Sequence, residues 1–220
     1  MMESHTFPHP LVLLAFAPPP SPPAKKASGA GDPHFRGFDG SRFSVHPAAG
    51  EWATVLASER QGFSLTALMA AGPVSGSTLM HAFKFRSGRD FIKAWLEPTG
   101  RTSPGKWRLQ ASANNQAVTG NKRLLSGTTL EFVPGADGVH GRLIIDADFI
   151  RVAIIQRWRP QRDTLADFLD VNVDVKRPLA LTGILGPSYH RALQRAGAGA
   201  VAAAASVGRP AFLSAASESD

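Results

Sequence analysis

Polar and apolar residues alternate along several short stretches of this chain. In Asp170–Val175 (DVNVDV) three valines alternate with three polar residues, and residues 81–86 (HAFKFR) follow the same pattern. Because successive side chains of a strand point to opposite faces of a sheet, such a stretch buries one face and exposes the other. The pattern therefore predicts β-strands with one buried face.

Other short runs rich in β-branched and aromatic residues recur between residues 31 and 186, separated by glycine, proline and asparagine. This arrangement is typical of strands joined by turns. The predicted strands are Arg42–Val45, Trp52–Ala57, Phe63–Met69, Leu79–Phe85, Asp90–Leu96, Trp107–Ala111, Thr128–Phe132, Gly141–Ile145, Arg151–Trp158 and Asp167–Val175.

These strands indicate an all-β domain, because the crossover helices that βαβ units need are missing. Burial of one face favours antiparallel sheets, packed as a sandwich or curled into a barrel-like module. We predict this domain over residues 31–186. A disordered leader and proline-rich linker is expected over residues 1–30. A poorly ordered alanine-rich tail, with room for one helix, is expected over residues 187–220.

The composition of the chain excludes several kinds of functional site. The chain of 220 residues has no cysteine, which excludes disulfides, thiolate zinc sites and cysteine nucleophiles. No apolar run reaches the roughly 18 residues of a membrane-spanning helix. The histidines show no metal-ligand spacing, and the carboxylates Asp146 and Asp148 have no evident catalytic partner. We therefore expect a non-enzymatic protein without a cofactor or a transmembrane segment.

The charge is modestly basic and unevenly placed. The 24 Lys and Arg residues exceed the 17 Asp and Glu residues, for a formal net charge of +7. The one dense basic group is Arg151, Arg157, Arg159 and Arg162. The first three share a parity at strand spacing and could line one face of a strand. A polyanion-binding module is therefore one alternative. Charge alone does not separate acidic polysaccharide from phosphate backbone, but the remaining basic residues are interleaved with acids, so nucleic acid is the less expected partner.

The first residues favour export. The apolar run Leu11–Ala17 ends in the small-x-small pattern AFA that signal peptidase prefers. We predict a signal peptide cut after Ala17, atypical because no basic residue precedes the apolar run and Pro18 follows it. Residues 18–23 (PPPSPP) then predict an extended polyproline II spacer. This spacer is similar to the proline-rich linkers of plant and green-algal cell-wall proteins.

Residues 31–40 (GDPHFRGFDG) form the most distinctive stretch of the chain. Three glycines, a proline and two aspartates within it predict a tight turn that presents His34 beside Asp32 and Asp39. A purely structural interpretation also stands, in which residues 39–40 form a hairpin turn and the neighbouring phenylalanines belong to the core.

GDPHF followed by FDG resembles the opening of the von Willebrand factor type D domain, a β-rich extracellular module of adhesive glycoproteins. Residues 168–173 (FLDVNV) and 181–186 (LTGILG) are similar to its last strand and its glycine turn. Residues 183–189 (GILGPSY) also resemble the ending of the plant root-cap and late-embryogenesis family. The resemblance implies an extracellular or cell-wall-associated structural or adhesion module that binds protein or acidic polysaccharide. It indicates no oligomeric state.

Two departures limit what carries over from the type D family. Its members are rich in disulfides, whereas this chain has no cysteine, so covalent multimerisation is excluded. The family's calcium loop follows the glycine turn and is rich in Asp and Asn, whereas residues 187–191 here are PSYHR. Calcium takes six to eight oxygen ligands. Asp32 and Asp39 alone are too few, and no metal site is predicted.

The resemblance implies a second alternative, which is self-processing at the Asp32–Pro33 bond. Some relatives that carry GDPH cleave themselves between these two residues. By resemblance, the carboxyl of Asp32 would be the internal nucleophile, Pro33 the leaving group and His34 a proton donor. Partial burial that raises the pKa of Asp32 would favour this reaction. Adhesion, polyanion binding and self-processing all remain open from the sequence.

Overall fold

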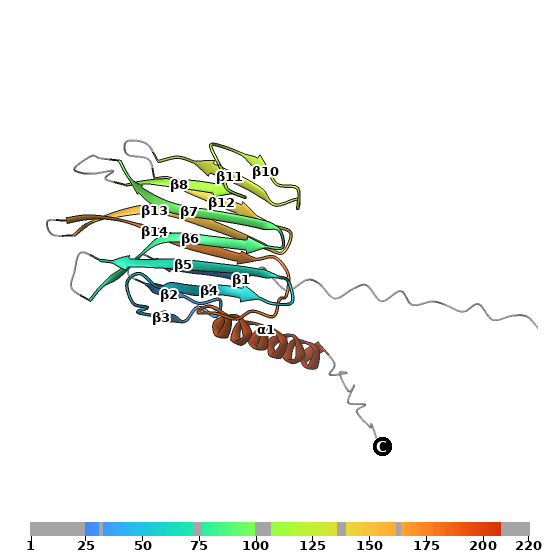
Figure 1. The fold of residues 1–220 in the computed structure, drawn as a ribbon. Coiled ribbons are helices and arrows are strands. Elements are labelled where there is room, and N and C mark those ends of the chain that lie inside the picture. Colours follow the sequence, from blue (N-terminus) through green and yellow to red (C-terminus); the bar gives the residue numbers. More distant parts are fainter. Residues whose placement is uncertain are drawn as a thin grey trace, which may run out of the picture.

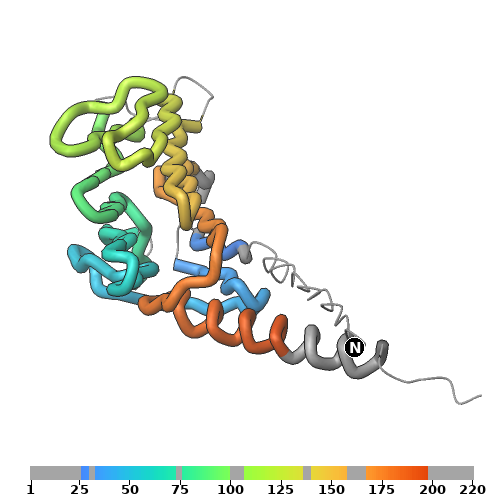
Figure 2. Tube along the Cα trace, turned by 90° about the vertical axis from the view of Figure 1, so that its right-hand side faces the viewer, coloured from blue at the N-terminus to red at the C-terminus, as the bar shows by residue number. Residues whose placement is uncertain are grey.

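The structure is a computed structural model that describes residues 25–30, 33–72, 76–99, 107–135, 140–161 and 164–207. Two antiparallel sheets stack on one another as a sandwich (Figure 1). One has eight strands in the order β10-β11-β12-β13-β14-β1-β2-β3, and the other has six in the order β4-β5-β6-β7-β8-β9. An edge-on view separates the cyan-to-green strands of the second sheet from the blue, yellow and orange strands of the first (Figure 2). The predicted all-β antiparallel sandwich is confirmed.

The elements have the following bounds. The eight-stranded sheet contains β1 (Lys25–Ala30), β2 (His34–Arg36), β3 (Arg42–Ser44), β10 (Lys122–Arg123), β11 (Thr129–Val133), β12 (Arg142–Asp146), β13 (Ile150–Gln161) and β14 (Thr164–Val175). The six-stranded sheet contains β4 (Trp52–Ser58), β5 (Phe63–Ala71), β6 (Thr78–Ser87), β7 (Asp90–Pro98), β8 (Trp107–Ala113) and β9 (Gln116–Ala117). One helix, α1 (Gly186–Val207), follows β14 in the chain.

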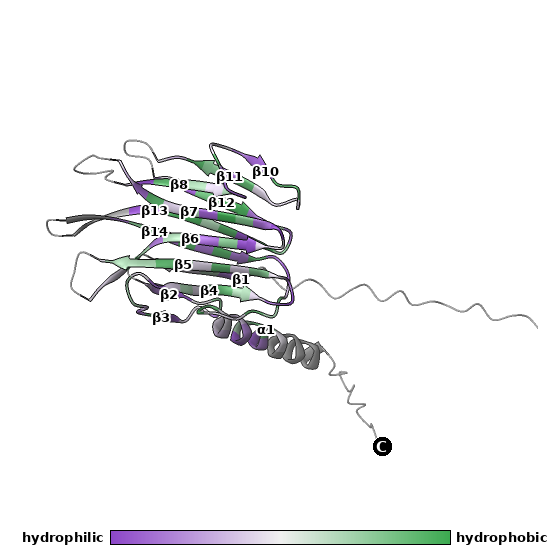
Figure 3. Cartoon of the chain, in the orientation of Figure 1, coloured by the Kyte–Doolittle hydropathy of each residue, from purple (hydrophilic) through white to green (hydrophobic). Residues whose placement is uncertain are grey.

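Each predicted strand is present, with ends that shift by a few residues. The alternating pattern has the expected physical cause: Val171, Val173 and Val175 of β14 are buried against the other sheet, whereas the polar residues between them are on the outer face. Hydrophobic and hydrophilic segments alternate along the strands of both sheets (Figure 3). Apolar side chains removed from water between the sheets supply the main driving force for this packing. The largest of the fully buried ones include Phe35, Phe83, Phe85, Leu56, Leu65, Leu109 and Leu143.

The domain begins earlier than predicted. Residues 25–30, assigned to the linker from their sequence, form β1 and lie between β14 and β2 in the middle of the sheet. Lys25–Ala30 (KKASGA) lacks the β-branched and aromatic residues that mark a strand. Its pairing comes from its two neighbours, and its glycine fits the packing, because a Cβ on Gly29 would lie 2.5 Å from the ring of Phe35.

The domain also ends later than predicted. The helix allowed for residues 187–220 is present as α1, but it begins at Gly186, and its first turns are packed onto the domain, because Ser188, Tyr189 and Ala192 are buried. The predicted signal peptide and the proline-rich spacer lie outside the described residues, as does the end of the tail after Val207. Within the described part of the chain, no helix is long and apolar enough to cross a membrane.

Two buried polar side chains join the sheets at one edge. Gln156 on β13 accepts a hydrogen bond from the backbone N–H of Leu109 (3.1 Å) and donates one to the carbonyl of Trp107 (2.8 Å). Asp167 on β14 accepts one from the N–H of Trp107 (3.2 Å). Since β9 pairs only with Ser112 and Ala113 of β8, these side chains satisfy backbone groups of β8 that the ladder leaves open.

Candidate functional site

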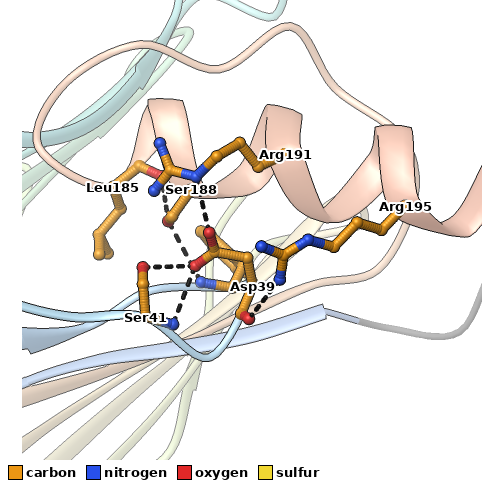
Figure 4. Close-up of polar contacts among 7 residues, drawn as sticks. Asp39, Ser41, Leu185, Ser188, Arg191 and Arg195 are labelled. Atoms are coloured by element: carbon orange, nitrogen blue, oxygen red, sulfur yellow. Dashed lines mark hydrogen bonds and ion pairs between the residues drawn. The ribbon is translucent and has the colours of Figure 1, made fainter.

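The FDG part of the GDPHFRGFDG motif docks onto the start of α1. The carboxylate of Asp39 accepts hydrogen bonds from Nε of Arg191 (2.7 Å) and from the hydroxyl of Ser41 (2.5 Å). Arg195 donates to the backbone carbonyl of Asp39 (3.2 Å). Figure 4 shows the two arginines reaching from successive turns of the helix toward Asp39.

The carboxylate of Asp39 is almost fully enclosed, with 1% of its side chain exposed. The hydrogen bond from Ser41 holds the pKa of Asp39 well below its usual range against the opposing effect of burial, and the hydrogen bond from Arg191 adds to it. Asp39 is therefore ionised at neutral pH and fully engaged by protein donors. These contacts give it a structural role.

The LTGILG motif covers an edge strand of the other sheet. Thr182 exchanges two backbone hydrogen bonds with Ala57 of β4 (2.9 and 3.1 Å), and the N–H groups of Ile184 and Leu185 donate to β4 carbonyls (both 3.0 Å). Gly183 has a φ of +88°, and a Cβ there would lie 2.9 Å from the carbonyl oxygen of Thr54. Glycine is needed because the turn combines a left-handed backbone with a close approach to β4.

Both motifs meet at Tyr189. Its ring packs edge-on against that of Phe38 at 5.1 Å between centroids, and its hydroxyl accepts a hydrogen bond from the N–H of Leu179 (3.1 Å). The hydroxyl of Ser188 accepts one from the N–H of Phe38 (3.2 Å). Asp39, Ser188, Tyr189 and Arg191, with Gly183, are hereafter the helix clamp. The described parts of the two most distinctive motifs thus stabilise the fold.

The predicted self-processing residues are only partly described. Asp32 lies outside the described residues, so self-cleavage stays a prediction. Pro33 is buried and its carbonyl accepts a hydrogen bond from the N–H of Val45 (3.1 Å). His34 is exposed on β2, with Nδ1 2.6 Å from the hydroxyl oxygen of Ser44. The weak calcium candidates are Asp32, which lies outside the described residues, and Asp39. Both carboxylate oxygens of Asp39 accept hydrogen bonds from protein donors. The described residues contain no cluster of His, Asp or Glu suited to a metal ion.

The predicted arginine group does not form one patch among the described residues. Arg151 and Arg157 lie on the outer face of β13, six residues and about 20 Å apart at strand spacing. Arg157 pairs with Asp170 (3.3 Å), and Arg151 lies directly opposite Asp146 and Asp174 in the sheet. Arg162 and the side chain of Arg159 lie outside what the structure describes. Arg157 is therefore paired with an acid, whereas Arg151 has acids beside it in the register but forms no ion pair among the described residues.

A different group of residues, which the sequence patterns did not indicate, lies on the outer face of the six-stranded sheet. Lys84 of β6 and Lys93 of β7 are directly opposite one another. Nζ of Lys84 lies 3.7 Å from the ring centre of Trp52, and Nζ of Lys93 lies 4.9 Å from that of Trp95. These four residues, together with Arg86, are hereafter the aromatic–basic face. Hydrophilic segments of β6 and β7 lie beside one another there (Figure 3).

Charge on this face is unbalanced. Among the described residues, Lys84, Arg86 and Lys93 form no ion pair; instead each cation lies over an aromatic ring, Phe91 in the case of Arg86 (5.9 Å). The acid nearest in the register, Glu97, lies opposite Arg108 and accepts a hydrogen bond from Gln110 (2.9 Å). The face therefore carries a local excess of positive charge.

Strand alternation places Lys84 and Lys93 on solvent-facing positions, so the sequence alone could have shown that both lysines are on the outer face. It did not contain the register that sets them opposite one another. The turn between the two strands sets this register, because Ser87 pairs with Asp90 across Gly88 and Arg89. The predicted strands ended at Phe85 and began again at Asp90, which left the length of the turn open.

The sequence matches no family model and no curated protein.

Proposed function

We propose that this protein is a non-enzymatic, exported β-sandwich module that binds an acidic polysaccharide through its aromatic–basic face. The observation that carries the proposal is the pair Lys84 and Lys93, which lie opposite one another without an acidic partner among the described residues. Like charges in this position destabilise a sheet. An anionic ligand that lies between them relieves this repulsion.

The lysines are held ready for an anion. An ammonium group over the face of an indole ring is stabilised by the ring quadrupole. Trp52 and Trp95 thereby restrict the two side chains and reduce the entropy lost on binding. Each ammonium group retains N–H donors that can point to a carboxylate.

The shape of the face suits an extended chain. Thr54, Thr66, Lys84, Lys93 and Ser112 are paired in one continuous row across β4 to β8. At the usual strand spacing this row is about 19 Å long. Hydroxyl groups flank the two lysines, so the row can hydrogen-bond sugar hydroxyls on either side of a bound carboxylate.

Sequence features support export and adhesion. The leader that ends at Ala17, the proline-rich spacer and the resemblance of GDPHF, FDG and LTGILG to the type D and root-cap families are all consistent with an extracellular or cell-wall module. We propose that residues 25–207 act there without disulfides, held together by the core and the helix clamp.

The test is calorimetric titration of the protein with an oligogalacturonate at low salt. The Lys84→Gln/Lys93→Gln variant should bind at least about tenfold more weakly, which corresponds to about 1.4 kcal/mol. The matched control, Arg157→Gln, also removes a cation from an exposed sheet face, but one that pairs with Asp170, and its affinity should change less than about twofold.

Two results would overturn the proposal. One is an equal loss of affinity in both variants, which would indicate a response to net charge alone. The other is tighter binding to single-stranded DNA of equal charge than to the oligogalacturonate, which would identify nucleic acid as the ligand. A neutral oligosaccharide of the same length serves as the baseline for both.

A further inference from the structure

A hollow of about 650 Å³ lies on the outer face of the other sheet, where β13, β14, β1 and β2 are neighbours. Lys26, Arg36 and Arg151 are among the residues that line it. This volume falls in the range of small-molecule sites in proteins. Because the hollow is on the eight-stranded sheet, it is separate from the aromatic–basic face.

The register brings these cations together from distant parts of the sequence. Arg151, Asp174 and Lys26 form one row across β13, β14 and β1. The next row consists of Ala153, Asn172, Ser28 and Arg36, and extends to β2. Small side chains in the second row leave the space, and the longer cationic side chains stand around it.

The charge of the hollow is not balanced by the protein. Asp174 is the one acid among its lining residues, and it lies 4.0 Å from Nζ of Lys26. The other carboxylate oxygen of Asp174 is buried and has no hydrogen-bond partner. Arg36 and Arg151 form no ion pair among the described residues. Three cations against one carboxylate leave a net positive hollow.

We infer that this hollow is a second anion site, which binds the carboxylate of an acidic sugar. Arginine presents N–H groups in a planar fork that matches a carboxylate. The hydroxyl of Ser28 and the amide of Asn172 lie between Arg36 and Arg151 and suit the hydroxyl groups of a sugar ring. Both are polar groups of a kind that fixes the orientation of a ligand in a pocket.

A second site on the opposite sheet has a consequence for function, which rests on the function proposed above. One protein molecule would hold two acidic chains, one on each side of the sandwich. Because both sites belong to one molecule, the two bound chains are tethered to each other. The module would then bridge polysaccharide chains as a monomer.

The experiment is an NMR titration of the ¹⁵N-labelled full chain with trigalacturonate. Two separate groups of amide signals should shift, one around residues 26–28, 36, 151–153 and 172–174 and one around residues 84 and 93. Arg36→Gln/Arg151→Gln should weaken the first response at least tenfold and leave the second unchanged. Lys84→Gln/Lys93→Gln should do the reverse.

The two sites can fail independently. If the first group of signals does not shift, or shifts equally in the Arg36→Gln/Arg151→Gln variant, the hollow is not a site, whatever happens at residues 84 and 93. If only the first group shifts, the hollow stands and the aromatic–basic face fails. Inorganic phosphate at the same concentration is the comparison ligand, and a response to phosphate alone would overturn the assignment to an acidic sugar.

Bridging has its own readout. Wild-type protein should increase the light scattering of a long polygalacturonate, and each double variant should abolish the increase while it still binds trigalacturonate at its remaining site. Scattering that persists in the Arg36→Gln/Arg151→Gln variant would overturn the bridging function.

Discussion

At the scale of single residues, Asp39 shows how one side chain can fix the position of an element. It lies in a turn between two short strands, and its carboxylate is bound by Ser41 beside it and by Arg191 from α1. Hydrogen bonds to an ionised group are stronger than neutral ones. In this enclosed position, Asp39 links residues that are about 150 positions apart in the chain.

Substitution Asp39→Asn should lower the free energy of unfolding by about 1 to 3 kcal/mol, since a charge-assisted hydrogen bond is lost and the partners remain. Urea denaturation at pH 7 measures this change. Asp148→Asn is the matched control, because Asp148 also pairs with an arginine, Arg177 at 3.1 Å, but 84% of its side chain is exposed. An exposed pair contributes little, so an equal effect of the two substitutions would contradict the role of Asp39.

The Asp39→Asn variant should also change how the stability of the protein depends on pH in acid. The folded-state pKa of Asp39 lies below its ordinary value of 3.8, chiefly through Ser41, so its contribution is present above that pH and is lost as the pH falls further. Burial lowers the pKa of His81 from 6.5, and this group reduces stability already below about pH 6.5. Asp39→Asn should flatten the decline of the free energy of unfolding below about pH 4, and should leave unchanged the decline that begins below about pH 6.5.

A substitution at Gly183 tests whether the turn in LTGILG needs glycine for its close approach to β4. Gly183→Ala places a Cβ at 2.9 Å from a β4 carbonyl in a left-handed backbone with φ +88°. Gly62→Ala is the matched control, because Gly62 has a φ of +61° and open space around it. The control should lose about 1 kcal/mol through backbone strain and Gly183→Ala about 2 to 4 kcal/mol. Equal losses in urea denaturation would show that the close approach to β4 is unimportant.

At the scale of elements, β1 is the strand that sequence patterns could not reveal. Its residues are small or charged, and its position is fixed by five register pairs with β14 and three with β2. The strongly patterned strands, such as β14, could be predicted because each carries its own apolar face. Short strands such as β9 and β10 depend on their partners in the same way as β1.

This difference predicts the effect of truncation. A chain that begins at Gly31 loses β1 and separates β2 and β3 from the rest of the sheet, so it should lose cooperative thermal unfolding measured by circular dichroism. A chain that begins at Lys25 retains every described strand and should keep it. If the chain that begins at Gly31 unfolded with an unchanged midpoint, β1 would be dispensable for the sheet.

At the scale of the whole molecule, the two outer faces differ in how their charges are balanced. Outside the hollow, the eight-stranded sheet has several ion pairs, such as Arg142 with Glu131 (2.5 Å), Arg157 with Asp170, and Lys176 with Asp146. The six-stranded sheet instead places cations over aromatic rings. Of the arginine-rich stretch in the sequence, Arg157 is paired with an acid on the neighbouring strand, whereas Arg151 lines the hollow on the eight-stranded sheet.

The aromatic–basic face and the hollow could not be predicted from the sequence, because each depends on which residues of different strands lie opposite one another. Lys84 and Lys93 are nine residues apart, and their solvent-facing positions follow from alternation alone. Whether they meet depends on the hairpin register. For the hollow, Lys26, Arg36 and Arg151 come together only once β1 is known to be a strand of the sheet.

The most direct test of the proposed function is the salt dependence of oligogalacturonate binding. Each charge contact released by salt steepens the fall of the binding constant with ionic strength. From wild type to Lys84→Gln/Lys93→Gln, we expect a weaker binding constant and a slope of log K against log salt that is smaller by about one to two units. A double variant with the wild-type slope and affinity would contradict a polyanion site at these two lysines.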